Sequence, residues 1–168
     1  MMKFKLENQK TYVEIDQSIL NKIQEKYDKN LIEVGGWLFG TYSTDMSTAI
    51  IEEAIFLPNV HKKPYTNFEF DKMDKQIWDE KHDLGLRVVG AFHTHPNNSP
   101  QPSIIDDDEM MRLASGELNC PEIIQLIMGK NHNTTLYFYT KYDKLQFFPV
   151  TSLEESLTQT QMDHQELG

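Results

Sequence analysis

The chain has 168 residues, of which 39% are apolar and 25% charged, a composition typical of one folded domain rather than of a disordered chain. It carries 16 basic and 26 acidic residues, and we expect no nucleic-acid partner because phosphate backbones attract basic surfaces. The single cysteine, Cys120, excludes an intramolecular disulfide and any zinc site built from several cysteines. The sequence has no apolar stretch typical of a secretory signal or a bilayer span, which predicts a cytoplasmic protein without a membrane role.

The first third of the chain predicts a helix followed by a strand hairpin. Asp16 is a typical N-cap residue, and apolar residues recur at helical spacing after it, so we expect a helix over 17–27. The inward face of this helix would comprise Ile19, Leu20, Ile23 and Tyr27. Residues 31–42 are apolar around glycines and residues 49–57 are rich in isoleucine, which predicts two buried strands joined by a turn over 43–47.

The remaining elements alternate between strands and helices. After a loop at 58–64 we expect a short strand at 68–70 and a helix over 71–82, capped by Asp71. This helix would turn inward Met73, Ile77 and Trp78. Further strands are expected at 87–95, 122–128, 135–142 and 145–150, with a helix at 103–114. The pattern predicts an α/β sandwich over 1–150, followed by a polar tail or surface helix over 151–168.

The most informative segment begins with two histidines. Residues two apart on a strand project to the same face, so His93 and His95 are able to offer two imidazoles to one ion. Prolines within 96–102 stiffen the connection to the next helix, where Ser103 and Asp106 have the spacing of a capping box. The Asp106 carboxylate in the first helical turn would face the histidines. Two imidazoles and one carboxylate leave a fourth tetrahedral position open, which is typical of a catalytic zinc site.

Other polar residues have simpler interpretations. The remaining histidines are expected to lie outside the site, and they are His61, His82, His132 and His164. Three acids after Asp106 would only stabilise the helix N-terminus, and they are Asp107, Asp108 and Glu109. Cys120 has no neighbour that would activate a thiolate, and we expect a small buried apolar residue there rather than a nucleophile.

These residues resemble the signature of the JAMM (JAB/MPN-type) zinc metalloproteases. In that family an upstream Glu is followed by His-x-His-Pro and, after seven intervening residues, by Ser-x-x-Asp, and this sequence matches both elements. The upstream element resembles residues 32–40, where the position of the glycines favours Glu33 over Glu52 or Glu53 on the next strand. The resemblance spans about residues 14–150. It implies a single JAB/MPN-like domain with a mixed curved sheet flanked by helices.

The resemblance also implies a role for each matched residue. His93, His95 and Asp106 would bind one Zn²⁺ per chain. Glu33 would hold the attacking water, accept its proton and return that proton to the departing amine. Ser103 would donate a hydrogen bond to the developing oxyanion. The single cysteine excludes the ligand pair of a zinc-dependent nucleobase deaminase, another class of zinc hydrolase.

The implied substrate is a ubiquitin-like protein, cut after its C-terminal glycine during deconjugation or precursor processing. The tail of such a substrate would be extended and would add a strand to a sheet edge, for which residues near 58–70 are candidates. Short connections at 58–66 and 115–121 resemble prokaryotic members, which either accompany ubiquitin-like conjugation in antiviral defence or trim sulfur-carrier proteins. A conjugating-enzyme-type protein is a further candidate partner. The alternative is a non-catalytic MPN-type binding scaffold, and the oligomeric state stays open.

Overall fold

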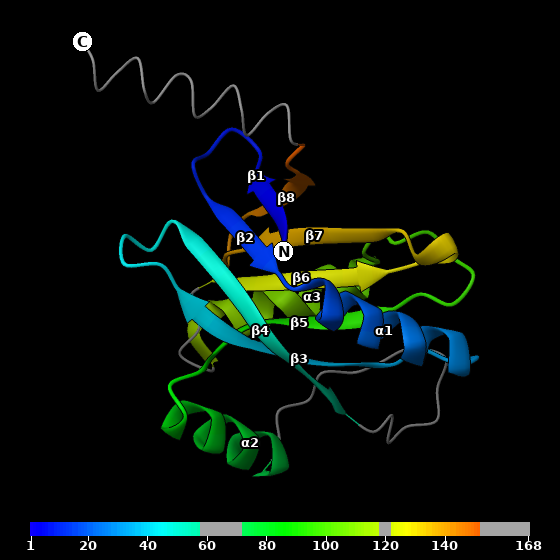
Figure 1. The fold of residues 1–168 in the computed structure, drawn as a ribbon, viewed down its shortest axis with the longest axis horizontal. Coiled ribbons are helices and arrows are strands. Elements are labelled where there is room, and N and C mark those ends of the chain that lie inside the picture. The colour runs from blue at the N-terminus through cyan, green and yellow to red at the C-terminus, as the bar shows by residue number, and fades with distance from the viewer. Residues whose placement is uncertain (58–71, 118–121, 152–168) are drawn as a thin grey trace.

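The computed structural model describes residues 1–57, 72–117 and 122–151, which form a mixed sheet with helices packed around it (Figure 1). The strands are β1 (Met2–Leu6), β2 (Tyr12–Ile15), β3 (Gly35–Tyr42), β4 (Thr48–Leu57), β5 (Arg87–Thr94), β6 (Ile123–Met128), β7 (Thr134–Tyr139) and β8 (Lys144–Pro149). The α-helices are α1 (Gln17–Lys29), α2 (Lys72–Asp83) and α3 (Ile104–Arg112), the last continued by a π-helical turn over Leu113–Glu117.

The sheet closes on itself in the order β1-β2-β4-β3-β5-β6-β7-β8, with β1 paired back to β8. Two neighbouring pairs, β2 with β4 and β5 with β6, are parallel, and the other pairs are antiparallel. The expected mixed, curved sheet with flanking helices is therefore confirmed. Strands β1 and β2, which are not among the elements expected from the sequence, close it.

Helix α1 and its inward face agree with the sequence-based expectation. The Asp16 carboxylate accepts a hydrogen bond of 2.8 Å from the backbone N–H of Ser18, which satisfies one of the unpaired donors of the first helical turn. The buried residues of this helix are Ile19, Leu20 and Ile23, and Tyr27 packs beside them. Strand β3, by contrast, begins at Gly35 rather than at residue 31, so Glu33 lies in the loop before the strand.

Alternating residues of the strands divide the core into two buried clusters. Along β3, Leu38 points to the cluster shared with α1, whereas Trp37 and Phe39 point to the cluster shared with α2 and α3. The expected inward residues Ile77 and Trp78 pack against this second cluster, and the Trp78 ring meets Trp37 edge-on at 5.1 Å. Met110 of α3 lies in the same cluster as residues of β5, β6 and β7, so α3 packs against these strands.

A glycine in β3 explains a local irregularity of the sheet. The pairing of β3 with β4 shifts register between Phe39 and Gly40, as expected if glycine marks a bulge. A Cβ atom on Gly40 would lie 1.8 Å from the carbonyl oxygen of Ile50, so the two backbones approach too closely for any side chain.

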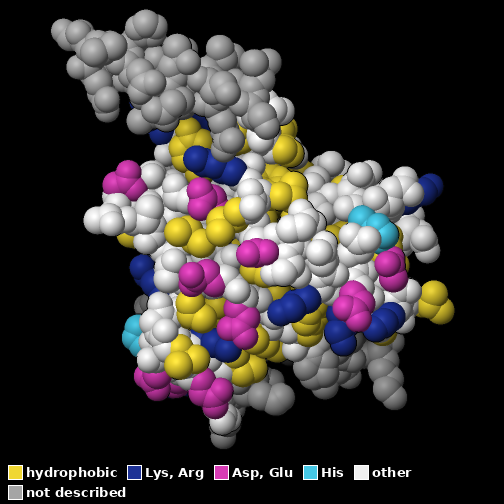
Figure 2. Space-filling model, viewed as in Figure 1, with side chains coloured by type: hydrophobic (Ala, Val, Ile, Leu, Met, Phe, Trp, Pro, Cys, Tyr) yellow, Lys and Arg dark blue, Asp and Glu magenta, His cyan; other side chains and the backbone are white. Residues whose placement is uncertain are grey.

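Several sequence-based expectations lie outside the described residues. They concern the loop at 58–64, the strand at 68–70, the cap Asp71, the histidines His61 and His164, Cys120 and the tail beyond Thr151. Among the helices in the described ranges, none combines the length and the apolar character that crossing a bilayer would need. On the face shown in Figure 2, the basic side chains of the described residues lie beside acidic ones rather than forming a continuous basic surface.

Candidate functional site

The two histidines lie at the carboxyl end of β5. His93 is 1% exposed and pairs in register with Gly35 of β3, and His95 follows the strand directly. The backbone N–H of His95 donates a 2.8 Å hydrogen bond to the carbonyl of Met128 at the end of β6. The second histidine is therefore anchored by the backbone although it stands just beyond the strand.

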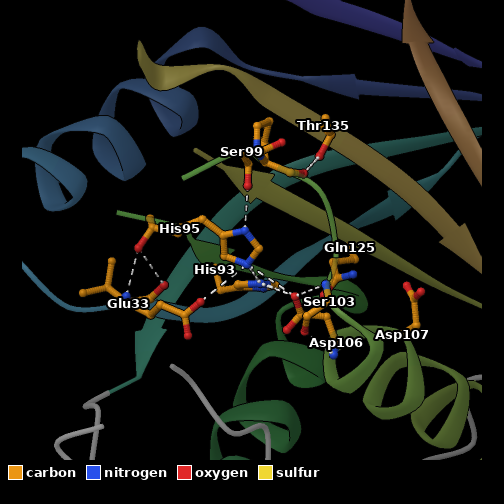
Figure 3. Close-up of polar contacts among 12 residues, drawn as sticks. Glu33, His93, His95, Ser99, Ser103, Asp106, Asp107, Gln125 and Thr135 are labelled. Atoms are coloured by element: carbon orange, nitrogen blue, oxygen red, sulfur yellow. Dashed lines mark hydrogen bonds and ion pairs between the residues drawn. The ribbon is translucent and has the colours of Figure 1, made fainter. Parts of the chain in front are cut away.

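The segment after the prolines places a carboxylate against these imidazoles. Ser103 is the N-cap of α3, and its Oγ accepts the Asp106 N–H at 3.0 Å while Asp106 Oδ2 accepts the Ser103 N–H at 2.8 Å. The predicted capping box is thus present in both directions. Asp106 consequently sits in the first turn of α3 with its carboxylate turned toward His93 and His95 (Figure 3).

The side chains converge on one point. The Nε2 atoms of His93 and His95 lie 2.9 Å apart, and each lies 3.3 Å from Asp106 Oδ2. Glu33 Oε1 lies 3.4 Å from His95 Nε2, and the ligand atoms of Glu33 and the two histidines all fall within 4.8 Å of one another. A tetrahedral zinc ion with bonds of about 2.0–2.1 Å separates its ligand atoms by about 3.3 Å. The donor types and their spacing therefore fit a zinc ion.

Glu33 is held beside β5 by its neighbour in the chain. The Val34 N–H donates to Thr94 Oγ1 at 3.0 Å, and the Thr94 N–H donates to the Val34 carbonyl at 2.9 Å. The two other acids considered from the sequence lie elsewhere, since Glu52 is exposed and Glu53 forms a 2.7 Å ion pair with Lys81 of α2. Of the three, Glu33 is the acid that lies at the histidines.

Hydrogen bonds prepare the imidazoles and the carboxylate for a cation. His95 Nδ1 lies 2.9 Å from the Ser99 carbonyl, which only accepts, so Nδ1 carries the proton and the Nε2 lone pair faces the cluster. Burial opposes a charged His95 ring, yet the hydrogen bonds to Asp106 and Ser99 outweigh burial and raise its pKa, so in the metal-free protein a proton competes for the Nε2 position that a cation would take. Burial likewise opposes ionisation of Asp106, but hydrogen bonds from His93 and His95 hold its pKa far below the ordinary value. Asp106 is thus ionised at neutral pH, as a metal-binding carboxylate must be.

An open cleft borders the cluster, and exposed apolar side chains stand next to its carboxylates in the sequence. The cleft has a volume of about 460 Å³, and its lining includes Leu31, Glu33, His95, Pro96, Asn98, Ser99 and Gln101. Two exposed apolar residues directly precede Glu33 in the sequence, and two more directly precede Asp106. We call these four side chains the apolar rim: Leu31, Ile32, Ile104 and Ile105. Leu31 is 94% and Ile104 79% exposed, so the rim is free to contact another molecule.

One expectation about the neighbouring acids is wrong. Asp107 does more than stabilise the N-terminus of α3, because its Oδ1 accepts the hydroxyl of Tyr139 at 2.5 Å and its Oδ2 pairs with Lys144 at 2.9 Å. One sequence pattern could have indicated this contact. Thr135, Tyr137 and Tyr139 alternate along a strand, which places three hydroxyl groups on one face. Of the other described histidines, His82 is exposed on α2 and His132 forms a 2.6 Å ion pair with Asp28, so both lie away from the cluster.

The fold and the cluster define a domain of the JAB/MPN class. Residues 17–141 match the family described as prokaryotic homologs of the JAB domain, and the chain belongs to that family. A relative from Enterobacter hormaechei subsp. hoffmannii (strain UCI 50), named CD-NTase/cGAS isopeptidase, is 32% identical over 121 residues. The aligned part covers 71% of this chain and 67% of that relative.

Two solved structures are similar to this chain to different degrees. The solution structure of protein DSY2949 from Desulfitobacterium hafniense matches with a TM-score of 0.57 and 19% identity, over 80% of this chain and 88% of that one. The crystal structure of AF2198, a JAB1/MPN domain protein from Archaeoglobus fulgidus, matches with a TM-score of 0.47 and 18% identity, over 82% and 94% of the two chains. At these identities the likeness to DSY2949 concerns the fold alone.

Proposed function

We propose that this protein is a zinc-dependent isopeptidase that cleaves after the C-terminal glycine of a ubiquitin-like protein. The observation that carries the proposal is the convergence of His93, His95 and Asp106 within 3.3 Å of one another, with Glu33 3.4 Å from His95. The three nearest side chains would hold the ion and leave one position open to the substrate side. A non-catalytic scaffold would have no need of an ionised carboxylate and oriented imidazoles converging on one point.

The neighbouring side chains would carry the proton transfers. Zinc, when bound, supplies a Lewis acid that polarises the scissile carbonyl and makes water more acidic. Glu33 accepts the proton of the attacking water and delivers it to the departing amine, so that a C–O bond forms, the isopeptide C–N bond breaks and one water is consumed. The Ser103 oxygen already accepts the Asp106 N–H, and its own proton remains available for the developing oxyanion.

The substrate class rests on the family and on the open cleft beside His95. One relative is named CD-NTase/cGAS isopeptidase, which supports an isopeptide bond as the target. The setting that we propose, from the resemblance to compact prokaryotic members, is a bacterial antiviral pathway. An open cleft beside His95 suits an extended protein tail, and small residues at the tail's end would allow its backbone to approach the ion. A ubiquitin-like conjugate is therefore the first substrate to test, and a sulfur-carrier precursor is the second.

Cleavage of defined fusions tests this proposal. The purified protein, loaded with Zn²⁺, is expected to release the cognate ubiquitin-like protein from an isopeptide conjugate or a C-terminal fusion, with mass spectrometry placing the cut after the terminal glycine. Replacing that glycine by a bulky residue should block cleavage by steric clash, and a chelator should abolish it. Equal cleavage of unrelated denatured proteins would instead indicate a general protease.

The apolar rim gives a separate prediction about substrate binding. Ile104→Ser should lower kcat/KM by about tenfold, mainly through KM, because burying an isoleucine side chain is worth about 1.5–3 kcal/mol and a tenfold change corresponds to about 1.4 kcal/mol. The matched control is Leu84→Ser, because Leu84 is 72% exposed but follows α2, away from the rim. Equal kinetics for the two variants would exclude Ile104 from the substrate contact.

A further inference from the structure

One face of β7 carries a row of three hydroxyl groups, which we call the hydroxyl row: Thr135, Tyr137 and Tyr139. These residues alternate along the strand and therefore project to the same side. Tyr137 and Tyr139 belong to the buried cluster that β7 shares with α3. The row thus faces the segment that leads into α3 and carries Ser103 and Asp106.

Each hydroxyl donates to a different point of that segment. Thr135 Oγ1 donates to the Pro100 carbonyl at 2.5 Å, and Tyr137 donates to Gln101 Oε1 at 2.9 Å. Tyr139 donates to Asp107 Oδ1 at 2.5 Å. Consecutive hydroxyls of the strand therefore contact the segment in order along its length, from its proline-rich start to the first turn of the helix.

The contact at Asp107 is fixed from both sides. Gln125 Nε2, on a side chain that is 1% exposed, donates to the Tyr139 oxygen at 2.9 Å, and this leaves the tyrosine proton for Asp107. Burial raises the pKa of Tyr139, as does its hydrogen bond to Asp107, so this hydroxyl keeps its proton at neutral pH. Lys144 holds the second carboxylate oxygen of Asp107 at 2.9 Å.

The contacts of Asp107 bear on the direction of the neighbouring carboxylate, Asp106. Asp106 and Asp107 are consecutive in a helix, so their side chains point about 100° apart around its axis. With Asp107 tied to β7 and Asp106 held by the capping box with Ser103, the Asp106 carboxylate points toward the end of β5, where the imidazoles lie. The buried contacts of Met110 and Leu113 set which face of α3 lies on the sheet, and the polar contacts of Asp107 add directional hydrogen bonds at its first turn.

We propose that the hydroxyl row of β7 positions residues 100–107, and thereby holds Asp106 toward the two histidines with Ser103 beside it. The row meets the cleft lining only through the hydrogen bond of Tyr137 to Gln101, and none of the contacts described above joins it to the histidines, so its members are positioning residues and not catalytic ones. The consequence for metal binding rests on the proposed zinc site, whereas the positioning of the segment does not.

Removal of two hydroxyls tests the proposal on the full chain. In Tyr137→Phe/Tyr139→Phe the rings remain to fill the core, and we expect the amides of Asp106 and Asp107 in the metal-free protein to exchange hydrogen at least tenfold faster. Both amides are bonded to Ser103, so they report the first turn of α3. Zn²⁺ affinity, measured by competition with a chelating dye, should fall about 10–100-fold, as when other groups that orient metal ligands are removed. The control Tyr142→Phe removes a hydroxyl from a 77% exposed tyrosine outside the row and should change neither quantity.

The two measurements separate this proposal from the proposed function. Unchanged exchange and unchanged Zn²⁺ affinity in the double variant would overturn the positioning role. A wild-type protein that binds no Zn²⁺ would contradict the isopeptidase proposal, while amide exchange would still decide the role of the row. If the double variant does not fold, the same measurements are made on the single variants Tyr137→Phe and Tyr139→Phe. Amide hydrogen exchange at the wild-type rate in both single variants would overturn the proposal.

Discussion

Glu33→Gln is expected to reduce turnover of a ubiquitin-like conjugate by at least about 10²-fold, because groups that act as general acid or base contribute about 10²–10⁴-fold. The amide keeps the size of the carboxylate and still donates or accepts hydrogen bonds, but it cannot take a proton from water. Zinc content and substrate affinity should remain at wild-type values. The variant would then retain its conjugate without cleaving it, and this trapped complex is measurable by pull-down and mass spectrometry.

The same variant distinguishes two roles for this carboxylate. Glu33 lies close enough to His93 and His95 to form a three-ligand group with them, while Asp106 lies 3.3 Å from each imidazole. If Glu33 were a ligand, Glu33→Gln would lose zinc together with activity. Glu52→Gln is the matched control because Glu52 is exposed on β4, and a loss of activity in this control with normal rates for Glu33→Gln would contradict the assignment of the acid.

Local interactions explain why the site could be predicted from the sequence. Two histidines two apart on a strand share a face, and a Ser-x-x-Asp cap forms within one helical turn, so neither feature depends on distant parts of the chain. Glu33 is a different case, since its place beside His95 depends on hydrogen bonds between Val34 and Thr94, which are 60 residues apart. The family resemblance supplied that assignment, which spacing alone left open among several acids.

The unpredicted features depend on distant pairings. Strand β1 pairs with β8 at the other end of the described chain, and the short strand β2 is completed by a parallel pairing with β4. Both strands are too short for their own pattern to identify them, at 5 and 4 residues. The contacts of the hydroxyl row also depend on residues far apart in the sequence, because its donors and acceptors are separated by 32 to 36 residues.

His95→Ala is expected to abolish metal binding and turnover together, because it removes one of three proposed ligands, the imidazole that lies 3.3 Å from Asp106 and 3.4 Å from Glu33. Elemental analysis of the wild-type protein should give one zinc per chain, and the variant should retain almost none. Zn²⁺ at 100 times its Kd stabilises the folded state by about 2.7 kcal/mol, which for a chain of this size raises Tm by about 5 °C or more. The variant should show no such rise.

The matched control for this variant is His82→Ala, because His82 is exposed near the end of α2 and lies outside the cluster. It should keep full zinc content, the Tm rise on adding Zn²⁺ and wild-type turnover. A wild-type protein purified with no zinc, and whose Tm does not respond to added Zn²⁺, would contradict the metal site itself. If His95→Ala lost turnover but kept one zinc per chain, the ion would have to be held by the other three side chains, and Glu33 would then be a ligand instead of the proton acceptor.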